Sequence, residues 1–322
     1  MAISQTTPRR ALLALSKDDH TLAIVDPANL RIVARVPIGP APHEVIASSD
    51  GKTAYSSNYN GTGYPLISVV DLVNQKALPA IDTGALTETH GLAYVGGKLW
   101  FTAQGSKAVA RYNPRTGKID WIMGTGQDRT HMIYVTPDEK HVYTTNPGSG
   151  TVTIMDRFPV PKPPGQPAAG AEVDWKETVI RVGRGDEGFD VSPDGKELWT
   201  ADAQDGTLSI IDLDSRKVVN TVDAKIVGSN RLEFTPDGKY VLISDLRGPD
   251  LYIYNAATRT EVKRVPIGHG AAGILMDPVA HRAFIACSPD NYIVVFDLKT
   301  FKVTGHLNVG GQPDGMAWAI RQ

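Results

Sequence analysis

Seven copies of one short segment run along the whole chain, and their spacing constrains the fold more than any other feature. Each copy is an apolar, β-branched stretch that closes on Asp or Asn. The closing residues are Asp26, Asp71, Asn113, Asp156, Asp212, Asn255 and Asp297. Successive copies lie 45, 42, 43, 56, 43 and 42 residues apart. A period in the low forties is typical of four-stranded sheets repeated around an axis. We therefore predict an all-β fold, a seven-bladed β-propeller.

One repeat, from Pro42 to Gly84, shows how a blade should be built. Alternating apolar and polar residues with β-branched and aromatic side chains predict antiparallel strands. The predicted strands are residues 44–48, 53–57, 66–71 and 76–81. Asp50-Gly51 joins the first two strands, because Asp can bond its own backbone and Gly accepts a positive φ.

The two ends of the chain complement each other. The chain begins with a second strand at residues 11–16 and ends with a first strand at residues 315–320. We expect these strands to pair and close the ring, which leaves no open sheet edge. Residues 1–322 are thus predicted to form a single domain.

One insertion, residues 157–174 (RFPVPKPPGQPAAGAEVD), causes the 56-residue step. Its Pro, Ala and Gly content predicts a loop between a third and a fourth strand. A tolerated surface insertion and a partner-docking loop both remain open.

Composition narrows the classes of partner. The formal net charge of −2 argues against nucleic acid. No apolar run approaches the ~20 residues of a membrane span. The N-terminal segment lacks the apolar core and cleavage site of a signal peptide. We therefore expect a cytoplasmic protein, or a periplasmic one whose leader has been removed.

The repeats resemble those of the YVTN-repeat, or YncE-like, family of seven-bladed propellers. The family tetrad is similar to residues Tyr55–Asn58, Tyr143–Asn146 and Trp199–Asp202, and the family turn to Pro193-Asp194-Gly195. The resemblance covers essentially the whole chain and implies the fold. Members include lactonase-like enzymes, binding proteins and redox-enzyme subunits, so it implies no single activity.

Ligand-type side chains recur at one position of the repeat, just before each inner strand. In ring order this position, here called the slot, holds His43, His90, His131, Glu187, Asn230, Ala272 and Asp314. Closure of the ring places Asp314 beside His43. Five neighbouring blades therefore offer Asp, His, His, His and Glu at one height.

Imidazole and carboxylate groups are the usual ligands of first-row metals, and three His with an open position are typical of a catalytic site. We predict a divalent transition metal (Zn²⁺, Mn²⁺, Fe²⁺, Ni²⁺ or Cu²⁺) held by His43, His90 and His131. Glu187 would be a fourth ligand or the general base, and Asp314 would orient a histidine. A metal-free polar pocket and purely structural histidines remain alternatives.

Other residues of the same face could bind a small-molecule substrate. The predicted contacts are Tyr59, Tyr64, Asn230, Arg231 and His269. The two tyrosines belong to a Gly-rich loop that could form a lid, and the arginine could hold a carboxylate.

An apolar column lies two residues beyond each slot. It consists of Val45, Leu92, Ile133, Phe189, Leu232, Ile274 and Met316. We expect it to form the dry floor of a pocket whose mouth is polar.

These patterns favour a metal-dependent hydrolase or lyase that acts on a small carbonyl compound. A metal could polarise the carbonyl and activate water. Lactone opening is suggested only by the family resemblance. The alternative is a non-enzymatic propeller that binds a protein or a small ligand.

Overall fold

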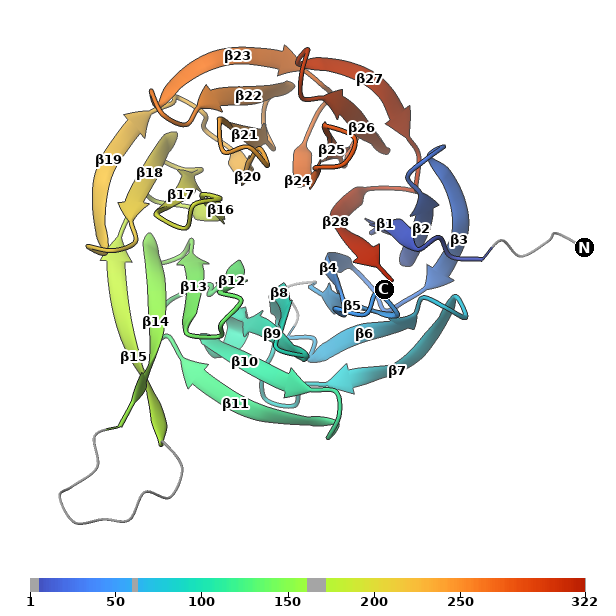
Figure 1. Ribbon diagram of the computed structural model, residues 1–322, viewed down its shortest axis with the longest axis horizontal. Coiled ribbons are helices and arrows are strands. Elements are labelled where there is room, and N and C mark those ends of the chain that lie inside the picture. Colours follow the sequence, from blue (N-terminus) through green and yellow to red (C-terminus); the bar gives the residue numbers. More distant parts are fainter. Residues whose placement is uncertain (1–5, 60–62, 161–171, 322) are drawn as a thin grey trace, which may run out of the picture.

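The computed structural model of the protein describes residues 6–59, 63–160 and 172–321. Seven four-stranded antiparallel sheets surround a central axis (Figure 1), which confirms the predicted seven-bladed propeller. One 3-10 turn, η1 (Gln104–Ser106), is the helical element of the described residues. None of the helices found there is long and apolar enough to cross a membrane.

The strands take equivalent positions in every blade. The innermost strands are β28 (Pro313–Ile320), β4 (Pro42–Ala47), β8 (Thr89–Val95), β12 (Ile133–Val135), β16 (Asp186–Val191), β20 (Ser229–Phe234) and β24 (Ala271–Asp277). The second strands are β1 (Arg10–Ser16), β5 (Thr53–Asn58), β9 (Lys98–Ala103), β13 (His141–Asn146), β17 (Glu197–Asp202), β21 (Tyr240–Asp245) and β25 (Arg282–Cys287).

The outer half of each blade follows the same order. The third strands are β2 (Thr21–Asp26), β6 (Leu66–Asp71), β10 (Ala108–Asn113), β14 (Thr151–Pro159), β18 (Thr207–Asp212), β22 (Asp250–Asn255) and β26 (Tyr292–Asp297). The outer strands are β3 (Arg31–Pro37), β7 (Lys76–Asp82), β11 (Lys118–Gly124), β15 (Val173–Arg181), β19 (Lys217–Asp223), β23 (Thr260–Pro266) and β27 (Lys302–Leu307).

Burial explains why the third strand carried the clearest repeat. In β2, β6, β18 and β26 the four central residues are all buried, because a neighbouring blade covers each face. Outer strands such as β11 and β19 instead alternate exposed and partly buried residues. A strand that is covered on both faces reads as a continuous apolar run, whereas a half-exposed strand alternates.

The hydrophobic core is divided among the seven contacts between neighbouring blades. Each contact has its own cluster; one contains Leu13 of β1 and Val45 of β4, and another contains Trp199 of β17 and Leu232 of β20. The predicted apolar column falls in these clusters, one member to each. The expectation that it forms a pocket floor is therefore wrong, because its side chains pack sideways between blades.

Pairing of the two chain ends closes the ring, as predicted. Strand β28 pairs with β1 in antiparallel register, from Arg10 opposite Ile320 to Ala14 opposite Met316. The Arg321 N–H donates to the Arg9 carbonyl at 2.7 Å and extends the ladder by one bond.

The insertion is less irregular at its ends than predicted. Strand β14 continues to Pro159 and β15 starts at Val173, so the two strands pair as a long ribbon that extends beyond the ring (Figure 1). The expected loop boundaries at 157 and 174 are thus corrected at both ends. Residues 161–171 lie outside the described part of the chain.

Candidate functional site

A β-bulge in the inner strand aims most of the slot residues toward the axis. In β4 the pairing with β5 shifts between Pro42 and Val45, so His43 and Glu44 lie in the bulge. Equivalent shifts occur in β8, β16, β20, β24 and β28. A bulge leaves its residues outside the ladder and redirects their side chains. In the remaining blade, His131 precedes β12 and its N–H donates to Thr145 O at 2.8 Å.

Hydroxyl groups of the second strand satisfy the backbone of these bulges. Ser57 Oγ accepts from Glu44 N–H at 3.1 Å, and Thr102 Oγ1 accepts from Gly91 N–H at 2.8 Å. Ser244 Oγ accepts in the same way from Arg231 N–H at 2.9 Å. Since a buried N–H without a partner is costly, these hydroxyls explain part of the repeated tetrad motif.

The slot residues enclose one small cavity at the mouth of the ring. Its volume is about 270 Å³, and all seven slot positions line it. Lys17, Tyr59 and Arg129 also line it. The predicted juxtaposition of these blades is therefore present in the structure.

Three histidines form a continuous arc along this cavity. The ring centroids of His43 and His90 lie 4.4 Å apart, and those of His90 and His131 lie 3.7 Å apart. His90 is fully buried, and neither of its ring nitrogens has a hydrogen-bond partner among the described residues. Burial lowers the pKa of His90 well below its usual value, and the neighbouring His131 and His43 lower it further. His90 is therefore neutral at pH 7 and can offer a lone pair.

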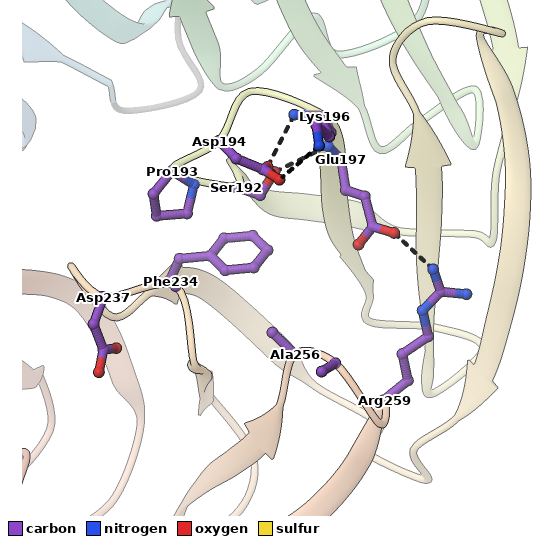
Figure 2. A pocket seen from close by; sticks show the side chains of 11 residues that line it. Ser192, Pro193, Asp194, Lys196, Glu197, Phe234, Asp237, Ala256 and Arg259 are labelled. Carbon is purple, nitrogen blue, oxygen red and sulfur yellow. Dashed lines mark hydrogen bonds and ion pairs between the residues drawn. The ribbon is translucent and has the colours of Figure 1, made fainter.

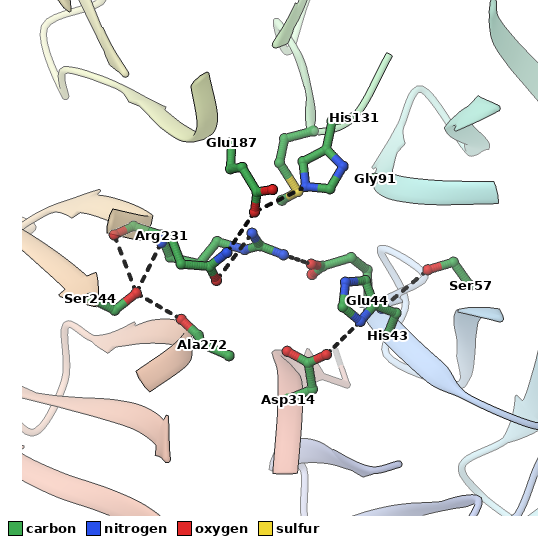
Figure 3. A network of polar contacts seen from close by, with 12 residues as sticks. His43, Glu44, Ser57, Gly91, His131, Glu187, Arg231, Ser244, Ala272 and Asp314 are labelled. Carbon is green, nitrogen blue, oxygen red and sulfur yellow. Dashed lines mark hydrogen bonds and ion pairs between the residues drawn. The ribbon is translucent and has the colours of Figure 1, made fainter. Parts of the chain in front are cut away.

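Asp314 holds one end of the arc. Its Oδ2 lies 2.5 Å from His43 Nδ1 and also pairs with the Lys17 ammonium (Figure 3 shows the histidine contact). Burial alone would raise the pKa of Asp314, but His43 and Lys17 hold it well below the usual range. The carboxylate fixes the His43 ring so that Nε2 is left for another partner, as in carboxylate–histidine–metal sites.

Glu187 closes the other end of the arc. Arg129 Nη2 donates to its Oε1 at 3.1 Å, and Asn230 Nδ2 donates to its Oε2 at 2.8 Å. His131 Nε2 lies 3.9 Å from Oε2, which is too far for a hydrogen bond. Glu187 is thus held beside the cavity by two donors.

Gln104 fixes the tautomer of His131. Its amide Nε2 donates to His131 Nδ1 at 2.8 Å, so the imidazole proton resides on Nε2. Burial, followed by the charges of Arg231 and Arg129, lowers the pKa of His131 well below its usual value. His131 is therefore a neutral hydrogen-bond donor toward the cavity rather than a free lone pair.

The ligand set that the geometry favours differs from the predicted one. Among the described residues, His43, Glu44 and His90 form the group whose ligand atoms all lie within 4.8 Å of one another. His131 and Glu187 are outside this group. Glu44 was not predicted as a ligand, because it lies one residue after the slot and one residue before the apolar column.

The position between the slot and the apolar column is occupied mostly by glycine, with two charged residues. It holds Glu44, Gly91, Met132, Gly188, Arg231, Gly273 and Gly315. A Cβ on Gly91 would lie only 2.6 Å from His131 O, and a Cβ on Gly273 only 2.5 Å from Asp314 O. The glycines therefore allow close packing around the axis. Glu44 and Arg231 are the two charged residues of this position, and their opposite charges are a sequence signal for a contact between them.

Only some of the predicted substrate contacts line the cavity. Tyr59 and Asn230 line the cavity, and the Tyr59 ring lies 5.2 Å from that of His90. Arg231 lies outside the lining and pairs with Glu44. Tyr64 and His269 do not line the cavity; His269 has a 73% exposed side chain that pairs with Asp290 at 3.2 Å. Residues 60–62 of the predicted lid lie outside the described part of the chain.

Larger hollows lie elsewhere, but three of them are lined by at most one histidine each. One of about 410 Å³ lies where two blades meet, beside the Pro193-Asp194 turn (Figure 2). Its charged groups are already paired: Arg259 Nη2 donates to Glu197 Oε1 at 2.6 Å, and Ser192 Oγ donates to Asp194 at 2.7 Å. These contacts join blades and shape turns, so the cavity at the mouth remains the better candidate site.

Comparisons with known proteins support the fold. No family model matches the chain, and no curated protein sequence matches it, so the YncE-like relationship stays a resemblance. A candidate 6-phosphogluconolactonase from Bacteroides fragilis superposes with a TM-score of 0.78 at 17% identity, over 98% of this chain and 99% of its own. A second from Bacteroides uniformis gives 0.76 at 16% identity, over 97% and 100%.

A redox protein also shares the architecture. The dihydro-heme d1 dehydrogenase NirN, solved in complex with DHE, gives a TM-score of 0.66 at 16% identity, over 95% of this chain and 65% of its own. At such identities the likeness establishes a common fold, and the chemistry must be argued from the site.

Proposed function

We propose that the protein is a lactonase-like hydrolase with a divalent transition metal bound by His43, Glu44 and His90. The observation that carries the proposal is the buried, unpartnered imidazole of His90 beside two further ligand atoms within 4.8 Å. A buried polar group without a partner is costly, and a bound cation would remove that cost. Ligands of one ion lie roughly 3.4 Å apart, so small side-chain adjustments would suffice.

The surrounding residues fit the donor set of such an ion. Two imidazoles and one carboxylate match the sites of Zn²⁺ and of other first-row metals. Asp314 orients His43 through Nδ1, which leaves Nε2 for the metal. When bound, the metal would polarise a carbonyl oxygen and lower the pKa of a coordinated water.

The chain's own residues then supply the proton chemistry. Glu187, held by Arg129 and Asn230 at the cavity wall, is suited to accept the proton of an attacking water. His131 can donate its Nε2 proton as a hydrogen bond to the carbonyl oxygen as negative charge develops there. Both support the opening of an ester or lactone bond, and the structural likeness to candidate lactonases agrees with this choice.

Metal content and lactone hydrolysis test the proposal together. The purified protein is dialysed against a chelator, reloaded with Zn²⁺, Mn²⁺, Fe²⁺, Ni²⁺ or Cu²⁺, and analysed for metal and for hydrolysis of sugar lactones. We expect one equivalent of one metal, and loss of both binding and activity in His90→Gln. His269→Ala, which removes an exposed histidine of the same face, should change neither.

Two outcomes would contradict the proposal. A protein that takes up none of these metals would favour a non-enzymatic binding module for a protein or small ligand. A protein that binds metal in the wild type and equally in His90→Gln would place the ion elsewhere.

A further inference from the structure

One ion pair joins two inner strands across the axis of the ring. Arg231 of β20 donates through Nη2 to Glu44 Oε1 of β4, although 187 residues separate them in the chain. The two strands belong to blades on opposite sides of the ring (Figure 1). The side chains are only 9% and 15% exposed.

The surroundings make this pair distinct from an ordinary surface ion pair. Four of the other five residues in the same column are glycines, so Arg231 and Glu44 meet in space that neighbouring blades leave free. Burial disfavours the charged form of Arg231, yet Glu44 and Asp314 keep its pKa above the ordinary value. The guanidinium is therefore a fixed positive charge that needs its carboxylate partner.

The pair also belongs to a wider network. Arg231 Nη1 donates to Asn230 Oδ1 at 3.4 Å, and Asn230 Nδ2 donates to Glu187 Oε2 at 2.8 Å. One arginine thereby connects the carboxylate of the proposed metal group to the carboxylate of the proposed general base.

We propose that Arg231 is a positioning residue that holds Glu44 in place as the carboxylate ligand of the metal. This inference rests on the proposed function above. Arg231 occupies one carboxylate oxygen of Glu44 and fixes its direction, which leaves the other oxygen for the ion. Groups that orient a metal ligand typically change metal affinity by 10- to 100-fold when they are removed.

A competing electrostatic effect would change metal affinity in the opposite direction from positioning. Arg231 is itself positive, and its charge alone would repel a cation bound at His90 and Glu44. If repulsion dominated, removal of the charge would tighten metal binding. If positioning dominates, removal frees the buried carboxylate to rotate away from the ion, and binding weakens.

The decisive measurement is the metal dissociation constant of Arg231→Met, taken with the metal that the wild type binds. We expect it to rise 10- to 100-fold in Arg231→Met and by less in Arg231→Lys, which keeps a charge but not the planar fork. In a Glu44→Gln background, Arg231→Met should have no further effect on metal affinity, since the arginine acts through that carboxylate.

A matched control separates positioning from general stability. Arg216→Met removes another arginine that bridges two blades, through Asp156. Asp156 contacts His141, and neither Arg216 nor Asp156 lines the cavity of the three-histidine arc. The Arg216→Met variant should lower the melting temperature without changing metal affinity. Arg231→Lys keeps the test valid should Arg231→Met fail to fold.

The outcomes distinguish the two proposals. Unchanged or tighter metal binding in both folded Arg231 variants would overturn the positioning role and leave the metal site intact. A wild-type protein that binds no metal would overturn the proposed function and this inference with it.

Discussion

At the scale of single residues, the inner part of the ring contains carboxyl groups that are buried without a counter-charge. Asp186, next to Glu187, is fully buried; its Oδ2 accepts from Asn146 N–H at 3.0 Å, and its Oδ1 has no partner among the described residues. Burial raises the pKa of Asp186 to about 8, against the effect of that hydrogen bond. The group is therefore protonated in the folded protein at neutral pH.

This shift predicts a pH-dependent gain from Asp186→Asn. Between about pH 4 and pH 8 the folded state keeps a proton that the unfolded chain releases, so wild-type stability falls as the pH rises. The variant does not titrate there, and its advantage should grow by about 1.4 kcal/mol per pH unit over that range. Urea unfolding at pH 5, 6.5 and 8 measures it.

Asp138→Asn is the matched control for this prediction. A hydrogen bond from Thr136 lowers the pKa of this exposed turn residue to about 2. Its stabilising effect is thus fully present above the unfolded pKa, and its loss should give a deficit that does not vary from pH 5 to pH 8. A gain in Asp186→Asn that is equally independent of pH would contradict the assignment of a protonated carboxyl.

At the scale of elements, the bulged inner strands determine which side chains face the axis and how closely neighbouring blades pack there. The bulge directs slot side chains toward the axis, and the glycine that follows it in four blades admits the backbone of the next inner strand. The site therefore depends on packing between strands as much as on its polar residues. A side chain in the glycine position should separate two blades.

Gly273→Ala tests this packing in β24, where the slot residue is Ala272 and not a histidine. Its Cβ would lie 2.5 Å from Asp314 O, and we expect a loss of about 1–3 kcal/mol of unfolding free energy, as for other overpacked sites. Gly305→Ala in the outer strand β27 has no heavy atom within 4 Å of its Cβ and should be close to neutral. Equal stabilities in chemical denaturation would show that the inner strands can separate without cost.

At the scale of the whole molecule, stability depends on closure of the ring. Each blade buries its faces against two neighbours, and the blade formed by β28, β1, β2 and β3 combines both chain ends. Without β28 the backbone edge of β1 would be unpaired. The hydrophobic cluster that includes Leu12 would also lose Met316, which belongs to β28.

A chain truncated after Gln312 should therefore fail to form a stable monomer. We expect loss of the cooperative thermal transition and association through the open edge, measured by calorimetry and light scattering. A circular permutant that keeps β28 and joins residue 321 to residue 9 should still fold, because those residues already lie next to each other. A truncated chain that melts like the full protein would show that closure is dispensable.

Much of the architecture could be predicted from the sequence because propeller blades repeat and contact mainly their neighbours. The period of the third strand predicted seven blades, and the complementary ends predicted the pairing of β28 with β1. The slot residues could be aligned in the same way, and all seven line one cavity. The apolar column was misplaced, since periodicity shows that a residue is buried but not which neighbour covers it.

The sequence by itself thus determined the number of blades, their closure and the arc of His43, His90 and His131, because each follows from a local pattern repeated at a fixed spacing. Only the tertiary structure decided that Glu44 joins His43 and His90, that Gln104 makes His131 a donor, and that Arg231 reaches Glu44 across the axis. Those contacts depend on the direction of side chains leaving a bulge and on strands far apart in the chain. No repeat encodes such directions, so they become visible only when the ring is assembled.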